Sequence, residues 1–140
     1  MRLMGLDVGS KTVGISVSDP LGWTAQAVEI IPIDEENEIF GIDRVAEIVK
    51  KEQVAGFVIG LPKNMNNTIG PKGELSLEFK SRLENILSIP VYLEDERLTT
   101  VTANNVLISG NVSRKNRKKV VDSVAATIIL QGYLDRSGKR

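Results

Sequence analysis

The first third of the chain shows the hydrophobic patterns of β-strands separated by short polar turns. The first pattern is an almost unbroken apolar run with Asp7 as the one charge inside it, which predicts a buried strand with an acid near its end. The second alternates strictly between apolar and polar positions, as a half-buried strand does. The third contains Pro32, which favours a sheet edge or a strand end. The three predicted strands, which we expect to form an antiparallel meander, cover residues 2–8, 12–18 and 25–33.

The rest of the chain alternates between helical and strand patterns. Apolar residues return every three or four positions from Ile39 to about Lys51, which predicts an amphipathic helix. A short apolar run follows and predicts a strand buried on both faces. The loop predicted over residues 61–73 is rich in proline, glycine and asparagine. Further predicted elements are strands over 54–60 and 89–93 and helices over 75–87, from 99 or 100 to about 109, and from about 118 to 135.

This order of elements predicts an α/β fold with one mixed five-stranded sheet. An antiparallel three-strand meander is joined by two parallel strands, and the crossovers between parallel strands place helices on both faces. A length of 140 residues suits a single domain over residues 1–140. Parallel strands present functional groups at their carboxyl ends, and Asp7 and the run 94–96 lie at or just beyond such ends.

Cysteine and histidine are both absent from the sequence. Their absence excludes disulfides, thiolate or histidine zinc sites, iron–sulfur clusters and Ser-His-Asp triads. Catalysis would therefore use carboxylates, lysines, hydroxyls or hard metal ions held by carboxylates. No apolar run is long enough to cross a bilayer, so we expect a cytoplasmic protein without a membrane partner.

Positive charge is concentrated near the carboxyl terminus, although the net charge of the chain is zero. Residues 111–140 carry eight basic and two acidic residues. Such a cluster suits a nucleic-acid phosphate backbone, although a solvated helix start explains it as well. Its five closely spaced cations are Arg114, Lys115, Arg117, Lys118 and Lys119.

Residues 5–12 approach the pattern of a phosphate-binding P-loop, with Ser10 in place of the second glycine. A P-loop must open a helix so that its amides face phosphate. The residues that follow Thr12 have the period of a strand instead. We therefore do not expect this segment to bind a nucleoside triphosphate.

Acidic residues from three separate elements carry the candidate chemistry. They are Asp7, the run Glu94-Asp95-Glu96, and Asp122 near the start of the last helix. A salt bridge or a cap would explain each acid alone, but acids gathered at one sheet edge repel unless cations hold them together. Oxygen ligands without histidine or cysteine suit Mg²⁺ or Mn²⁺, and two such ions support phosphodiester hydrolysis without a histidine base.

Four separated motifs resemble the YqgF/RuvX family over nearly the whole chain. They are residues 5–14 with Ser18-Asp19, Gly60-Leu61-Pro62 with Met65 and Gly70, residues 95–100, and Lys119 with residues 122–126. Two positions depart from the family pattern. Met65-Asn66-Asn67 stands where an Asp-Gly pair is usual, and Thr12 stands where arginine is usual. Both departures would affect the grip on substrate rather than the acids.

The resemblance implies a ribonuclease-H-like fold related to Holliday-junction resolvases. It also implies a nuclease, a hydrolase of phosphodiester bonds, that matures the 5′ end of pre-16S rRNA. Its acidic triad would fall on Asp7, Glu96 and Asp122, with Asp95 and Glu94 as rivals for the middle place. The expected nucleic-acid contacts are Lys11, Asn64, Arg97, Arg114, Lys115, Arg117, Lys118 and Lys119.

The favoured function is that of a metal-dependent nuclease on structured nucleic acid, with an rRNA precursor favoured over a DNA four-way junction. Other functions stay open at this point. The alternatives are a Holliday-junction resolvase and a module that binds rRNA or a transcription complex without cutting. An actin-like ATPase is excluded by size, because those enzymes close two domains over the nucleotide. Either a monomer or a homodimer fits the sequence.

Overall fold

The computed structural model describes residues 2–34, 36–63, 66, 68–95 and 114–137, and for residues 114–124 it describes the backbone alone. The strands are β1 (Arg2–Val8), β2 (Thr12–Ser18), β3 (Ala25–Pro32), β4 (Val54–Leu61) and β5 (Val91–Asp95). The helices are α1 (Ile42–Glu52), α2 (Pro71–Leu87) and α4 (Arg114–Arg136).

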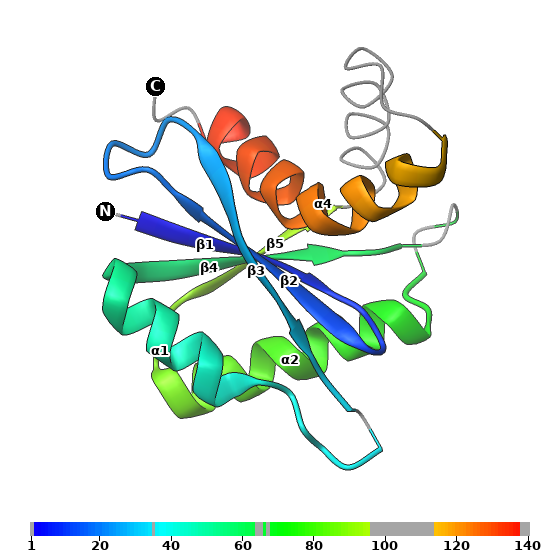
Figure 1. Cartoon of the computed structure of the whole chain (residues 1–140). Coiled ribbons are helices and arrows are strands. Elements are labelled where there is room, and N and C mark those ends of the chain that lie inside the picture. The colour runs from blue at the N-terminus through cyan, green and yellow to red at the C-terminus, as the bar shows by residue number, and fades with distance from the viewer. Residues whose placement is uncertain (1, 35, 64–65, 67, 96–113, 138–140) are drawn as a thin grey trace.

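The five strands form one mixed sheet in the order β3-β2-β1-β4-β5. Strands β1, β2 and β3 pair antiparallel, whereas β1 with β4 and β4 with β5 pair parallel. The predicted meander with two added parallel strands is therefore confirmed (Figure 1). Because β1, β4 and β5 run in one direction, their carboxyl ends meet at the same edge of the sheet.

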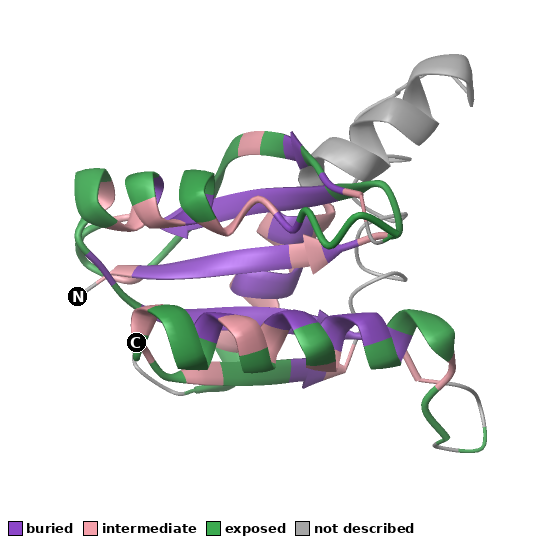
Figure 2. Ribbon diagram, turned by 90° about the horizontal axis from the view of Figure 1, so that it is seen from below, coloured by how far each residue is buried: buried purple, intermediate pink, exposed green. Residues whose placement is uncertain are grey.

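Helices cover both faces of this sheet, as predicted. Helices α1 and α2 lie on one face and α4 lies on the other (Figure 1). The buried residues concentrate in the strands between these layers (Figure 2). Strand β1 contributes to both layers because its side chains alternate. Met4, Leu6 and Val8 pack in the core toward α1 and α2, whereas Leu3 packs with Ile129, Leu130 and Leu134 of α4.

Strand β2 differs from its prediction, because it is buried on both faces. Gly14, Ser16 and Ser18 are as buried as the apolar residues between them. The sequence pattern indicated a half-buried strand, since small polar residues usually face water. Here α4 covers that face, and small side chains allow the helix to approach closely.

Three elements have bounds that differ from the predicted ones in ways that concern the candidate site. Helix α2 begins at Pro71, inside the predicted loop, because proline at the first helical turn has the φ that a helix requires. Strand β5 extends to Asp95, so Glu94 and Asp95 lie within a strand rather than beyond its end. Helix α4 begins at Arg114, so its first turns contain the basic cluster. The helix predicted to end near residue 109 lies outside the described residues.

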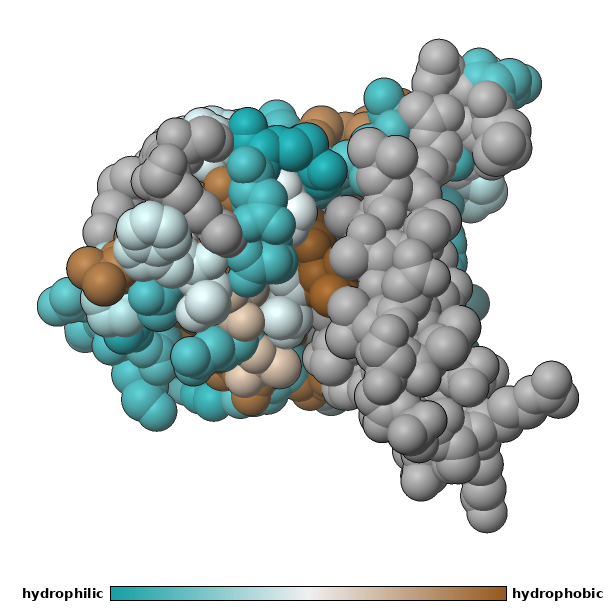
Figure 3. All heavy atoms as spheres, turned by 90° about the horizontal axis from the view of Figure 1, so that it is seen from above, coloured by the Kyte–Doolittle hydropathy of each residue, from teal (hydrophilic) through white to brown (hydrophobic). Residues whose placement is uncertain are grey.

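None of the described helices is long and apolar enough to span a membrane. Seen from the α4 side, most of the described surface is hydrophilic, with small apolar patches (Figure 3).

Candidate active site

Asp7 lies one residue before the end of β1, on the face of the sheet that α4 covers. Strand alternation places it there, because Leu3 and Gly5 on the same face of β1 both approach α4. Its neighbour in β2 is Gly14, which has no side chain to crowd the carboxylate. Asp7 is half-buried, whereas the sequence predicted a buried strand at this position. The difference arises because the sheet ends here.

A hollow of about 260 Å³ opens beside Asp7 at this edge. It is lined by the turn between β1 and β2 and by the first turn of α2, with Asp7, Val8, Gly9, Ser10, Lys11, Thr12, Gly14 and Lys72 as the lining residues. Two backbone hydrogen bonds fix the turn: the Gly9 amide donates to the Thr12 carbonyl at 2.8 Å, and the Ile33 amide donates to the Lys11 carbonyl at 2.8 Å. The hollow thus brings a carboxylate and two exposed lysines together.

Lys72 was not predicted as a site residue: residues 61–73 were assigned to a loop, from which Asn64 was selected. It belongs to α2, which begins at Pro71. The first turn of this helix lies close to the end of β4, since a Cβ on Gly73 would come within 2.8 Å of the Pro62 carbonyl oxygen. That close approach brings Lys72 to the edge of the sheet that holds Asp7. Pro71 was the sequence signal for this helix start.

Glu94 lies in the same cross-strand row as Asp7. Leu6 pairs with Ile59, so the next residues on the two parallel strands, Asp7 and Gly60, also lie side by side. Gly60 pairs in turn with Glu94. Two strand spacings place the Cα atoms of Asp7 and Glu94 about 10 Å apart. Glu94 is buried and forms an ion pair with Arg136 of α4.

Strand alternation separates Asp95 from this row. Tyr92 stacks on Tyr133 of α4 with ring centroids 5.4 Å apart, and Glu94 also faces α4. Val91 packs instead against the core beneath α1 and α2. Asp95 shares its face with Val91 and is therefore directed away from the α4 side, where Asp7 lies.

Asp122 lies in α4, one helical turn before Ala126. Ala126 is held against the sheet, because the Ser16 hydroxyl donates a hydrogen bond to its carbonyl oxygen at 2.7 Å. The backbone thus places Asp122 one turn from a fixed contact with β2. The predicted phosphate contacts Arg114, Lys115, Arg117, Lys118 and Lys119 lie earlier in the same helix.

The structure describes only some of the predicted site residues. It places Asp7 and Lys11 at one hollow, Glu94 in the same row, and Asp95 on the other face. Glu96, Asn64 and Arg97 lie outside the described residues. Within the part of the chain whose side chains are described, no three acidic residues lie close enough to hold a metal ion.

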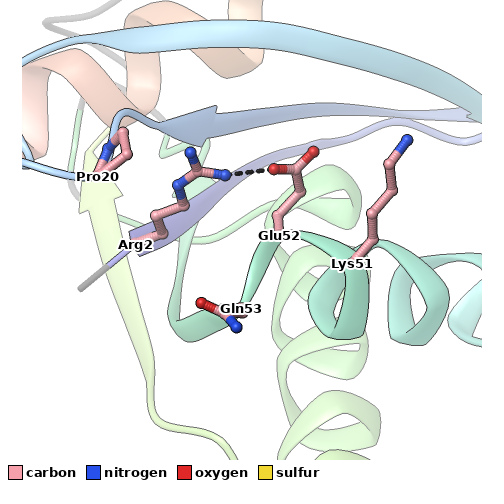
Figure 4. Close-up of a pocket in the computed structure, with 5 residues that line it drawn as sticks. All are labelled: Arg2, Pro20, Lys51, Glu52 and Gln53. Atoms are coloured by element: carbon pink, nitrogen blue, oxygen red, sulfur yellow. Dashed lines mark hydrogen bonds and ion pairs between the residues drawn. The ribbon is translucent and has the colours of Figure 1, made fainter.

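A second hollow of about 260 Å³ lies at the opposite end of β1 (Figure 4). It is lined by Arg2, Pro20, Lys51, Glu52 and Gln53. Arg2 and Glu52 point toward each other and form an ion pair. The hollow beside Asp7 lies instead at the carboxyl ends of the parallel strands, where open α/β sheets bind their ligands, and is therefore the better candidate for an active site.

Comparisons with known proteins agree with this fold. Thermus thermophilus RuvC in complex with a Holliday junction substrate has a TM-score of 0.58 and 16% identity, over 99% of this chain and 97% of its own. The fowlpox virus Holliday junction resolvase has a TM-score of 0.53 and 14% identity, over 98% and 99% of the two chains. These likenesses show the predicted ribonuclease-H-like fold.

Relatives at higher identity are named for a function. Proteins named "Putative pre-16S rRNA nuclease" from Limosilactobacillus reuteri strain DSM 20016 and Limosilactobacillus fermentum strain NBRC 3956 are 72% and 64% identical. Each alignment covers 99% of this chain, with 96% and 97% of the respective relatives. A family model described as "RuvX: Holliday junction resolvase" matches residues 1–136. The resemblance predicted from the sequence motifs is therefore confirmed, and the chain belongs to the RuvX family.

Proposed function

We propose that this chain is a divalent-metal-dependent nuclease that hydrolyses phosphodiester bonds in structured nucleic acid, with the 5′ end of pre-16S rRNA as its substrate. The observation that carries the proposal is the hollow at the carboxyl end of β1, where Asp7 lies with Lys11 and Lys72. The two ammonium groups suit the negative oxygens of a phosphodiester, and the carboxylate beside them suits the divalent ion that would act on it.

The donor chemistry of this edge fits Mg²⁺ or Mn²⁺. The chain has no histidine or cysteine, so its ligands for an ion are oxygens, which hard divalent cations prefer. Asp7, Glu96 and Asp122 are the proposed ligands. Glu96 is preferred over its rivals because Glu94 already pairs with Arg136 and Asp95 lies on the other face. One or two ions bound there would activate the attacking water and stabilise the leaving oxygen.

The chain's own cations would hold the substrate around this carboxylate. Lys11 lies in a turn whose backbone is fixed by hydrogen bonds, and Lys72 lies in the first turn of α2. We propose that both contact phosphates next to the scissile bond. The basic cluster of α4, with Arg97 and Asn64, would contact the strand farther away, where phosphate contacts fix orientation without selecting sequence.

The substrate class follows from the relatives. Two proteins at 72% and 64% identity are named for pre-16S rRNA, which favours rRNA over a DNA junction. The same proposal includes a role in ribosome biogenesis in the cytoplasm and a single domain over residues 1–140. Each proposed ligand comes from one chain, so a monomer is sufficient, and a homodimer is compatible.

A cleavage assay on two substrates tests the proposal. A precursor rRNA 5′ segment and a DNA four-way junction would each be incubated with Mg²⁺, with Mn²⁺ or with excess chelator, alongside Asp7→Asn as the inactive control. We expect metal-dependent cleavage of the RNA. Cleavage of the junction alone would indicate a resolvase, and binding of RNA without any cleavage would indicate a non-cleaving binding module.

A further inference from the structure

Helix α4 is joined to the sheet by a hydrogen bond from a buried side chain. The Ser16 hydroxyl donates to the Ala126 carbonyl oxygen at 2.7 Å, and Ser16 is fully buried. This carbonyl belongs to the backbone of the helix. Because a hydrogen bond requires a narrow range of distance and angle, a side-chain donor aimed at one helix carbonyl constrains both the rotation of the helix and its position along its axis.

Gly5 makes this close contact possible. A Cβ at position 5 would lie 2.7 Å from the Ala126 carbonyl oxygen and 2.7 Å from Leu130 Cβ. It would also lie 2.5 Å from the Ser16 hydroxyl oxygen. The helix backbone therefore rests almost directly on the backbone of β1, at a distance that any larger residue would increase.

Asp7 and Asp122, the two proposed acid positions, lie at similar short distances along the backbone from this contact. Asp7 is two residues beyond Gly5, which is about 7 Å along a strand. Asp122 is four residues before Ala126, which is about 6 Å along a helix. Leu3 packs with Ile129, Leu130 and Leu134, so the later part of α4 lies toward the amino end of β1. The earlier part therefore extends toward the carboxyl end, where Asp7 is.

We propose that Ser16 is a positioning residue: its hydrogen bond to Ala126 sets the register of α4 on β1 and thereby the separation of Asp7 from Asp122. Ser16 lies away from the hollow that would take the substrate, so it acts through the helix alone. The inference rests on the proposed function, because the two acids matter together only if they share an ion.

Ser18 supplies a matched control on the same strand and the same face. Its hydroxyl oxygen is also buried and accepts a hydrogen bond from the Leu3 amide at 2.9 Å, a contact within the sheet rather than to α4. Ser16→Ala and Ser18→Ala each remove one buried hydroxyl. Both variants should lower the melting temperature, but only the first should change the register of α4.

The test measures Mn²⁺ binding to the purified protein by electron paramagnetic resonance, without nucleic acid, and then steady-state cleavage. For Ser16→Ala we expect Mn²⁺ affinity to fall by about 10–100-fold and kcat by up to about 100-fold, with KM nearly unchanged. Ser18→Ala should keep both within about twofold at a temperature where it is folded. Gly5→Ala, which pushes the helix away, should resemble Ser16→Ala.

Two outcomes overturn the inference, and they are distinguishable. If Asp7→Asn lowers Mn²⁺ affinity and cleavage but Ser16→Ala behaves like Ser18→Ala, then Ser16 has a structural role alone and the proposed function stands. If Asp7→Asn also leaves Mn²⁺ binding and cleavage unchanged, then the proposed function and the positioning role fail together.

Discussion

At the scale of single residues, the proposed site is centred on one carboxylate at the end of a strand. Asp7 is half-buried, so its charge is partly desolvated, and it faces a hollow rather than the core. A carboxylate at the rim of a hollow can be reached by an ion or a substrate, which is the role that we propose for Asp7.

Asp7→Asn separates these roles, because asparagine keeps the shape and removes the charge. If Asp7 is a metal ligand, cleavage should fall by orders of magnitude, since an ion's charge stabilisation and water activation depend on it. The melting temperature of the metal-free protein should hold or rise, because carboxylate repulsion is relieved. Thermal melts and cleavage rates on this variant are the measurements. A strongly lowered melting temperature with residual activity that follows the folded fraction would contradict the assignment.

Glu94 and Asp95 of β5, and Glu96 directly after it, should respond differently to neutralisation. Glu96→Gln should abolish cleavage with little change in stability, because it removes a proposed ligand. Glu94→Gln should cost about 1–2 kcal/mol of unfolding free energy, since it breaks a buried carboxylate's ion pair with Arg136. Asp95→Asn should have the smallest effect on cleavage. Urea unfolding and cleavage rates on the three variants test this order, and an inactive, stable Asp95→Asn would reassign the ligand.

At the scale of elements, hydrogen bonds to side chains hold the loop between β2 and β3. The Asp19 carboxylate accepts hydrogen bonds from the Thr24 amide at 2.9 Å and the Trp23 amide at 2.6 Å. Gln131 of α4 accepts from the Ala25 amide at 3.0 Å and donates to the Trp23 carbonyl at 3.1 Å. The loop is therefore fixed both locally and to the helix.

This loop should weaken in acid. Amide hydrogen bonds, chiefly from Thr24, hold the pKa of Asp19 below its usual value of 3.8. A lowered pKa means that Asp19 stabilises the folded state above pH 3.8, and that this contribution is lost as the pH falls through the lower value. The difference in unfolding midpoint between the native protein and Asp19→Asn should therefore be constant near neutrality and shrink below about pH 4. Urea melts followed by Trp23 fluorescence measure it, and a difference that grows in acid would contradict the prediction.

The basic cluster at the start of α4 should supply affinity rather than sequence choice. Neutralising Lys115, Arg117 and Lys118 together should weaken binding similarly for unrelated sequences and reduce the salt slope by up to about 2–3 units. Neutralising Lys50 and Lys51, two exposed lysines on α1 across the sheet, is the control and should leave the slope nearly unchanged. Binding titrations at several salt concentrations provide the slopes. An unchanged slope in the triple variant would indicate that the cluster is a solvated helix start without a role in binding.

At the scale of the whole molecule, opposite charges are separated along a chain of zero net charge. The acids that we assign to the site come from β1, the end of β5 and α4. If the assignment holds, folding would gather negative charge that is dispersed in the unfolded chain. The basic residues of α4 lie on the element that also carries Asp122. One helix would thus contribute both to ion binding and to phosphate binding.

Divalent ions should therefore stabilise the fold as well as support activity. Mg²⁺ or Mn²⁺ should raise the melting temperature of the native protein, because an ion that binds the folded state alone shifts unfolding by mass action. Asp7→Asn should lose this shift. Cleavage should stop in excess chelator and return with Mn²⁺, which accepts the same oxygen ligands. Cleavage undiminished by the chelator would refute the metal requirement.

The sequence by itself was sufficient to predict the strands and their connections. Hydrophobic period is a local property, and strict alternation in residues 12–18 already distinguished a strand from the helix that a P-loop requires. Turn residues and the later helix–strand alternation then left few topologies, of which the observed sheet order is one. The absence of histidine and cysteine and the motifs predicted the class of chemistry and the family before any contact was known.

Only the tertiary structure decided which faces and neighbours these residues have. Ser16 looked like the polar side of a half-buried strand, but α4, more than 100 residues later, covers it. Lys72 reaches the Asp7 hollow because α2 begins at Pro71 and lies close to the end of β4. Asp95 is separated from Glu94 by strand alternation once the bounds of β5 are known. Each of these depends on packing between distant segments, which the local pattern of a sequence does not encode.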